Sequence, residues 1–368
     1  MNKALPSATS VKASPAGLNL LPVKRSVPLD TALLTAELEA HNLAIDTEFT
    51  PRQFAGGLAN LNYLIRLEDG WAVLRRPPSG PLPPGANDMA REHRILSNLW
   101  RVLPLAPRSL HLCTDAAIIG VPFQILEFRS GQAIRGDRLL FLPETADTGR
   151  ALSALLIDTL ALIHEVIPEA VGLETLGRPE GFFMRQVTGW VRRANYVCGD
   201  MLPTAAAEVA NWLIGSVPPP EDATVLLHCD FKLDNILLDS ATLKPGTIVD
   251  WDMGTRGPAL FDLATMLSYW TEVGDPDCMH RLAQMPTAKA GFLSRAEAAH
   301  AYARRTGRSI SAIQSYRVLT IFKLAVVFLQ LHRRHLTGET SDPRYVSFGS
   351  LGEELFIFAL DVARGRLF

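Results

Sequence analysis

The sequence lacks the features that mark secreted, membrane-spanning or disulfide-stabilised proteins. Its 368 residues include only 4 cysteines, which lie far apart and form no Cys-x-x-Cys pair. This spacing argues against a zinc site and a disulfide framework, and it fits a reducing cytoplasm. The N-terminus has no apolar core of a secretion signal. The longest apolar run, residues 318–331, contains Lys323 and is too short to cross a bilayer, so we expect no membrane association.

An excess of charge and an internal repeat are also missing. The formal net charge is −2, which argues against a nucleic-acid partner. Hydrophobic residues make up 48% of the chain, enough for the core of one large or two medium domains. Residues 1–28 mix Ser, Pro, Ala and Lys without periodicity, and they are predicted to form a poorly ordered tail.

One polar stretch, flanked by apolar segments, organises the rest of the chain. It reads His-x-Asp-x-Lys-x-x-Asn and contains Asp230, Lys232 and Asn235. Asp250 and Asp252 follow another short apolar segment. The pattern predicts strand, polar loop, strand, turn and strand, so these side chains should meet at one end of one small sheet.

The residue types in this stretch suit phosphoryl transfer. Asp230 can orient an attacking hydroxyl and accept its proton, while Lys232 can neutralise charge on the moving phosphoryl group. Asn235 and Asp250 offer the oxygen ligands that Mg²⁺ prefers, and Asp230 and Asn235 have the spacing of a kinase catalytic loop. Each residue alone could equally cap a turn or fill a polar core. The joint pattern favours a kinase that uses ATP and Mg²⁺.

The same residues resemble those of a known superfamily. The runs that carry the resemblance are residues 228–235, 248–252, 257–258 and 262–264. They are similar to the aminoglycoside phosphotransferase and choline kinase superfamily of small-molecule kinases. Residues 74–78 and 91–96 resemble one branch, the kinase-like domain fused to, or encoded beside, acyl-CoA dehydrogenases. The resemblance covers roughly residues 45–350.

This resemblance implies a two-lobe, protein-kinase-like α+β fold. Residues 29–128 would form an N-lobe with an antiparallel sheet and a helix, and residues 129–368 a mainly helical C-lobe with short catalytic strands. Glu127 and Phe128, at the hinge between the lobes, would meet adenine. Asp262 would brace the catalytic loop rather than touch substrate.

Further nucleotide contacts are expected in the N-lobe. Gly56, Gly57 and Asn60 lie in a glycine-containing hairpin that could cover phosphates, although an ordinary hairpin turn fits the same residues and a Gly-x-Gly-x-x-Gly motif is lacking. Arg75 ends a strand where kinases carry lysine, and Glu92 is its expected ion-pair partner. The alternatives are that Arg76, on the opposite face, takes this role, and that Glu92 is solvated.

The acceptor is predicted from charge and from the resemblance. Residues 281–335 contain ten basic residues and one acid, a balance that would attract an anion, unless these side chains pair with acids elsewhere. The branch points to a hydroxyacyl-CoA or hydroxy acid in acid catabolism, with an acyl-CoA dehydrogenase in the same pathway. An aminoglycoside or choline-type kinase, and a pseudokinase that docks to a partner enzyme, remain open alternatives.

Overall fold

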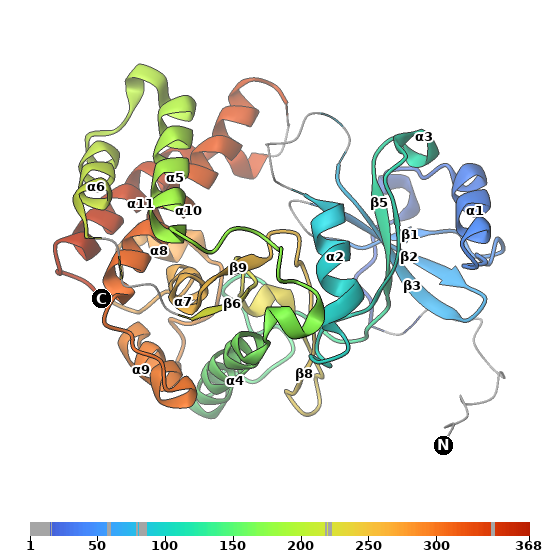
Figure 1. The fold of residues 1–368 in the computed structure, drawn as a ribbon, viewed down its shortest axis with the longest axis horizontal. Coiled ribbons are helices and arrows are strands. Elements are labelled where there is room, and N and C mark those ends of the chain that lie inside the picture. The colour runs from blue at the N-terminus through green and yellow to red at the C-terminus, as the bar shows by residue number, and fades with distance from the viewer. Residues whose placement is uncertain are drawn as a thin grey trace. The chain divides into compact units, whose positions relative to one another are not determined.

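The computed structural model describes residues 15, 17–56, 60–78, 80, 87–217, 219, 223–339 and 343–368, in two compact units. The first contains the described residues up to Met89 and Ser109–Ser130; the second contains Ala90–Arg108 and Gly131–Phe368 (Figure 1). The boundary between the two units at Ser130 and Gly131 lies beside the lobe boundary that was expected at Arg129. Residues 90–108 belong to the second unit, however, because this segment hydrogen-bonds to strand β8 (Pro245–Ile248) there: the Ile248 N–H donates to the Leu105 carbonyl at 2.7 Å.

The first unit is built on a five-stranded antiparallel sheet. The strands, in spatial order, are β1 (Arg52–Gln53), β2 (Leu61–Leu67), β3 (Gly70–Arg76), β5 (Phe123–Glu127) and β4 (Ser109–Cys113). Helix α1 (Thr31–Ala40) begins at its cap Asp30 and buries Leu34 and Leu38 in a core shared with Leu74 of β3. A short helix, α3 (Ala116–Ile119), precedes β5. The expected antiparallel-sheet N-lobe is confirmed.

The described part of the predicted tail is ordered against this sheet. Leu20 forms a β-bridge with Phe54, and the Leu21 N–H donates to the Gln53 carbonyl at 2.8 Å. The Tyr63 hydroxyl donates to the Val27 carbonyl at 2.9 Å. The prediction of a poorly ordered segment is therefore wrong for residues 17–28, because the edge strand β1 offers them backbone partners. Residues 1–14 and 16 lie outside the described part of the chain.

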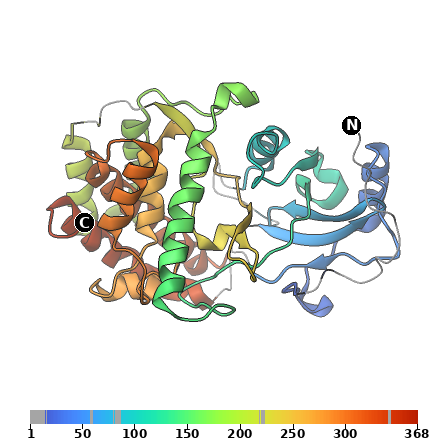
Figure 2. The same cartoon turned by 90° about the horizontal axis from the view of Figure 1, so that it is seen from below.

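The second unit is mainly helical. Its helices are α2 (Met89–Leu99, from Ala90 onward), α4 (Ala146–Glu165), α5 (Phe182–Cys198), α6 (Thr204–Gly215), α7 (Ala259–Ser268), α8 (Asp277–Leu282), α9 (Arg295–Thr306), α10 (Ile313–Leu336) and α11 (Phe348–Ala363). Helix α10 is long and apolar enough to cross a membrane, but most of it is buried, and it packs against α5, α6, α7 and α11. It is thus the core helix of this unit. Helix α4 lies beside strand β6 (Thr224–Leu227; Figure 2).

The short strands of the second unit form two sheets. Strand β6 (Thr224–Leu227) pairs with β9 (Thr255–Pro258), and β7 (Ile236–Leu238) pairs with β8 (Pro245–Ile248). The prediction of one small sheet is therefore wrong. The strands do not join into one sheet because the backbone N–H groups of His228 and Cys229, directly after β6, donate to the Asp262 side chain instead of to a neighbouring strand.

Candidate active site

The loop that follows β6 is held from two sides by buried charged residues. The Asp262 carboxylate, fully buried on α7, accepts hydrogen bonds from the His228 and Cys229 N–H groups at 2.6 and 2.7 Å. The Lys323 ammonium, from α10, donates to the Cys229 carbonyl at 3.1 Å. Cys229 has φ +67°, a conformation that costs energy for any residue except glycine. These bonds hold the strained turn, and they confirm the bracing position expected for Asp262.

His228 connects this loop to the end of β8. Its Nδ1 accepts a hydrogen bond from the Asp230 N–H at 3.3 Å, so its Nε2 carries the proton and donates to the Val249 carbonyl at 3.0 Å. The ring is completely buried and lies 4.7 Å from the Trp251 ring, centroid to centroid. His228 thus has a structural position, with both nitrogens bonded to backbone.

Asp230 is the centre of the hydrogen-bond network. Lys232 Nζ lies 3.0 Å from its Oδ2 and 3.3 Å from its Oδ1, and the Asn235 amide nitrogen donates to Oδ2 at 3.1 Å. The Tyr269 hydroxyl donates to Oδ1 at 2.6 Å. Burial would raise the pKa of Asp230, but Lys232, Tyr269 and Lys323 outweigh it and hold the pKa below its ordinary value. Asp230 is therefore an ionised carboxylate at neutral pH.

Tyr269 was not predicted from the sequence to belong to the site. This residue follows the last turn of α7, and its ring also lies under the Lys232 ammonium, 4.8 Å from Nζ to the centroid. Burial, followed by the charge of Asp230, raises its pKa well above the ordinary value. Tyr269 therefore remains a neutral hydroxyl that donates to the carboxylate.

The β7–β8 hairpin brings the two predicted metal ligands to adjacent strand ends. Ile236 is in register with Ile248, and the Val249 N–H donates to the Asn235 carbonyl at 2.9 Å. Asn235 directly precedes β7, and Asp250 closely follows β8. The Asn235 amide nitrogen bonds to Asp230, so its amide oxygen is the atom that can coordinate a cation.

The electrostatics of the loop fit a divalent cation. Burial alone would lower the pKa of Lys232, but Asp230, Asp234 and Asp250 raise it above its ordinary value. The pKa of Asp234 is raised by burial even though Arg135 pairs with it at 3.0 Å. Three carboxylates thus surround one ammonium. The surplus of oxygen ligands and negative charge suits Mg²⁺, with Asn235 and Asp250 as the residues that would hold it.

Glu92 makes a contact that the sequence did not predict. It is completely buried in the first turn of α2, and its Oε1 accepts a hydrogen bond from the Trp251 N–H at 3.0 Å. Arg91 Nη1 donates to the Asp252 carbonyl at 3.2 Å. The alternative of a solvated glutamate is wrong: α2 holds the turn that follows Asp250. The Arg75–Glu92 pair joins residues of different units and stays a prediction.

In the first unit, the structure separates the two candidate arginines of β3. Arg76 is buried on the core face, where its Nη1 donates to the Ile119 carbonyl at 3.3 Å and its Nε to the Pro77 carbonyl at 3.2 Å. Arg75, which is buried as well, lies on the other face, and its Nη1 donates to Asn62 Oδ1 at 3.3 Å. Arg76 is thus used structurally, and Arg75 is the better candidate for binding phosphate.

The remaining residues with predicted nucleotide contacts lie at turns or strand ends of the first unit. Gly56 has φ +95°, and Asn60 Oδ1 accepts a hydrogen bond from Asn87 at 2.9 Å. Glu127 ends β5 and pairs with Arg129 at 3.0 Å, and Phe128 follows it, partly buried. Gly57 lies outside the described residues. Contacts of these residues with a nucleotide stay predictions.

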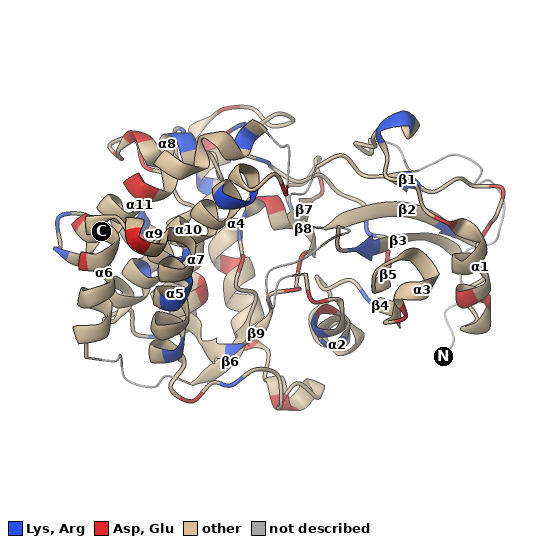
Figure 3. Cartoon of the chain, turned by 90° about the horizontal axis from the view of Figure 1, so that it is seen from above, with Lys and Arg blue, Asp and Glu red and all other residues tan. Residues whose placement is uncertain are grey.

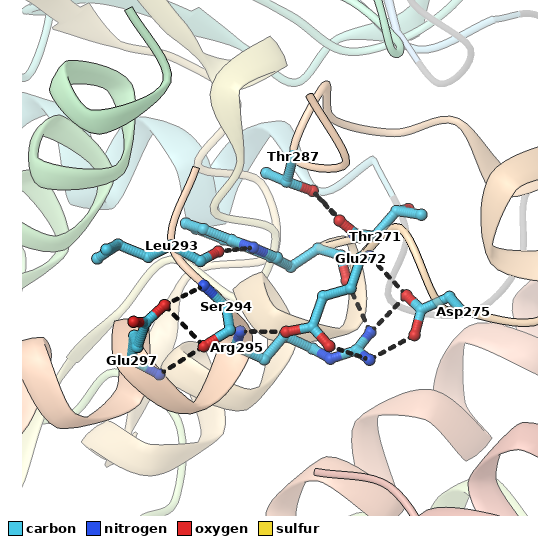
Figure 4. A network of polar contacts seen from close by, with 9 residues as sticks. Thr271, Glu272, Asp275, Thr287, Leu293, Ser294, Arg295 and Glu297 are labelled. Atoms are coloured by element: carbon cyan, nitrogen blue, oxygen red, sulfur yellow. Dashed lines mark hydrogen bonds and ion pairs between the residues drawn. The ribbon is translucent and has the colours of Figure 1, made fainter. Parts of the chain in front are cut away.

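Half of the basic residues in the segment 281–335 pair with acids among the described residues. Five of its basic residues pair with acids: Arg281 with Asp277 and Glu354, Lys289 with Glu144, Arg295 with Glu272 and Asp275, Arg305 with Asp158 and Glu165, and Arg334 with Glu339. Acidic and basic positions accordingly lie close together around α8 and α11 (Figure 3). Arg295 is buried within a network of such bonds (Figure 4). The alternative that these side chains pair with acids elsewhere therefore holds for five of the ten basic residues.

The comparisons with known proteins agree with this fold. A model of the phosphotransferase enzyme family matches residues 50–300. Acyl-CoA dehydrogenase family member 11 of Gallus gallus is 27% identical over 321 residues, which are 85% of this chain and 40% of that protein. The chain therefore spans less than half of this relative.

Solved structures show the same architecture. An aminoglycoside phosphotransferase homologue from Ralstonia eutropha has a TM-score of 0.74 at 23% identity, over 92% of this chain and 99% of that one. A thermostable mutant of aminoglycoside phosphotransferase APH(4)-Ia, in ternary complex with AMP-PNP and hygromycin B, has a TM-score of 0.54 at 16% identity, over 86% and 95% of the two chains. At these identities the likeness establishes the fold, which is the kinase-like fold expected from the sequence.

Proposed function

Because the chain belongs to the phosphotransferase enzyme family, we propose that it transfers the γ-phosphoryl group of ATP to a hydroxyl of an anionic small molecule, a hydroxyacyl-CoA or a hydroxy acid. One observation carries the proposal. The carboxylate of Asp230 lies within hydrogen-bond distance of Lys232 and Asn235, and the β7–β8 hairpin sets Asp250 beside this group. This is the set of side chains that phosphoryl transfer requires.

Each residue has a role that follows from its contacts. Asp230, ionised and held by hydrogen bonds, orients the acceptor hydroxyl and takes its proton as the hydroxyl oxygen bonds to the γ-phosphorus and ADP leaves. Lys232, protonated among carboxylates, neutralises charge on the transferred group. Asn235 and Asp250 would hold Mg²⁺. When bound, that ion supplies positive charge to the phosphate oxygens.

Two arginines of α5 support an anionic acceptor. Arg193 lies 4.4 Å above the Trp190 ring, and burial together with the charge of Arg192 lowers its pKa. No carboxylate among the described residues forms a salt bridge with either arginine. A bound carboxylate or phosphate would relieve this repulsion. The name of the Gallus gallus relative also points to acyl-CoA chemistry, in which a phosphorylated hydroxyl could later leave by elimination.

A panel of acceptors tests the reaction. ATP consumption is measured with 3- and 4-hydroxyacyl-CoAs, free hydroxy acids, choline and kanamycin-type aminoglycosides. We expect turnover of the anions. Asp230→Asn should lower kcat by roughly 10²–10⁴ with little change in the KM for ATP, because only the general base is lost. Asp239→Asn, an exposed turn residue, is the matched control.

The results separate the parts of the proposal. Full turnover by Asp230→Asn would show that the base is wrongly assigned, whereas turnover of the cations alone would overturn the acceptor class. A double variant, Arg192→Ala with Arg193→Ala, should raise the KM for the anionic acceptor and leave the KM for ATP unchanged. Arg150→Ala, whose side chain is 60% exposed, controls for loss of surface charge.

A further inference from the structure

A cluster of potential metal ligands lies in the first unit, between α1 and β4. Glu37 and His41 are four residues apart and therefore lie on the same face of α1. His111 lies on β4, on the strand face that also carries the buried Cys113. Leu34 of α1 is in the same hydrophobic core as Cys113, which holds the helix against this strand. The fold thus brings a carboxylate and two imidazoles together from segments far apart in sequence.

The donor atoms are close enough to share one cation. Glu37 Oε1 lies 3.0 Å from His111 Nε2 and 3.5 Å from His41 Nδ1. One donor atom from each of the three residues lies within 4.8 Å of the others, and the two imidazole centroids are 4.3 Å apart. Ligands of a tetrahedral zinc ion, bound at about 2.1 Å, are about 3.4 Å apart. His41 Nδ1 donates a hydrogen bond to the Glu37 backbone carbonyl at 2.8 Å, so the exposed His41 ring must rotate and give up this bond to complete the set.

The proton on His111 Nε2 occupies the position that a metal would take. His111 is 8% exposed. A metal binds the imidazole nitrogen that carries no proton. Glu37 accepts a hydrogen bond from His111 Nε2, and a metal at this position would take the place of that proton. The thiol of Cys113 is directed to the Asp115 carbonyl, at 3.8 Å, and is not one of the three ligands.

We propose that Glu37, His41 and His111 bind a late first-row divalent cation, preferentially Zn²⁺, with solvent in the fourth position. Two imidazoles and one carboxylate form a known zinc ligand set, and imidazole donors favour Zn²⁺ over Mg²⁺. The site cross-links α1 to β4. Its two nitrogen donors distinguish this site from the Asn235–Asp250 pair, which offers oxygen donors only.

The test uses the full chain after treatment with a chelator, carrying Asp250→Asn so that the proposed Mg²⁺ position contributes no signal. Zn²⁺ is titrated by calorimetry, and Co²⁺ is added as a spectroscopic substitute. We expect one equivalent of Zn²⁺, a visible cobalt spectrum of tetrahedral intensity that Zn²⁺ abolishes, and a higher midpoint of thermal unfolding with Zn²⁺. Absence of saturable Zn²⁺ binding would overturn the proposal.

Ligand variants locate the site. Glu37→Gln and His41→Ala should each weaken Zn²⁺ binding at least about tenfold and remove the thermal shift. Glu39→Gln on the same helix and His280→Ala, both at exposed positions, are the matched controls and should bind as the parent does. Because His41 is exposed, its variant remains informative even if a variant of the buried His111 fails to fold. Equal binding by His41→Ala and His280→Ala would contradict the site.

Discussion

Because Asp262 braces the catalytic loop, we can predict how far the free energy of unfolding falls when its carboxylate is replaced. Its carboxylate accepts the N–H groups of His228 and Cys229 in a fully buried position. The variant Asp262→Asn preserves size, but an amide has one acceptor oxygen where the carboxylate has two. One of the two N–H groups would then face a donor in place of an acceptor.

The size of the effect follows from these two bonds. A buried N–H group left without a partner costs about 1–3 kcal/mol. The other N–H group keeps a partner but exchanges a charged acceptor for a neutral one, a loss of about 1 kcal/mol. The free energy of unfolding should therefore fall by about 2–4 kcal/mol. Because Cys229 is in a strained conformation, kcat should fall as well.

Urea denaturation, followed by circular dichroism, measures the loss. Asp277→Asn is the control, because this carboxylate also pairs with a cation, Arg281, but its side chain is 78% exposed. An exposed ion pair contributes at most about 1 kcal/mol, so the control should be nearly as stable as the parent. If Asp262→Asn and Asp277→Asn proved equally stable, the account of a charged brace beneath the loop would be refuted.

Four further variants test the residues assigned above. Asp250→Asn should abolish Mg²⁺-dependent binding of a fluorescent ATP analogue, and unchanged binding would remove Asp250 from the metal site. Tyr269→Phe removes a hydrogen bond that lowers the pKa of Asp230, so this pKa should rise in the variant. The acid limb of the plot of kcat/KM against pH should then move to higher pH. An acid limb that does not move would contradict the role of Tyr269. Arg75→Ala should raise the KM for ATP, whereas Arg76→Ala should mainly lower the free energy of unfolding, and the reverse outcome would show that the wrong face of β3 was chosen.

Local sequence patterns were sufficient to predict helices such as α4 and the contacts among the charged and polar side chains of the loop. The apolar periodicity of residues 144–166 predicts a helix, and α4 covers Ala146–Glu165 with Thr145 as its cap. Likewise, the spacing of Asp230, Lys232 and Asn235 along one short loop places them in contact, because five residues cannot carry them far apart. In both cases the residues that interact are neighbours in the chain.

Local sequence patterns did not predict the residues that form hydrogen bonds with this loop. Tyr269 bonds to Asp230 across 39 positions, and Lys323 reaches the Cys229 carbonyl across 94. Nothing in the local spacing of an aromatic or a lysine in an apolar helix indicates such a contact. The same holds for the pairing of β6 with β9, because any short apolar strand could have been the partner.

The motif residues that resemble those of a kinase superfamily were enough to predict the kinase-like fold, since motif spacing is a local property of the chain, and the catalytic roles of these side chains stay predictions. Three-dimensional packing was required to show that Glu92 holds the turn after Asp250, and that half of the basic residues in the segment 281–335 pair with acids such as Glu354. Charge counted along a sequence does not reveal where the opposite charges will lie. Those positions depend on how distant helices pack, and packing responds to the whole set of buried side chains rather than to any one stretch.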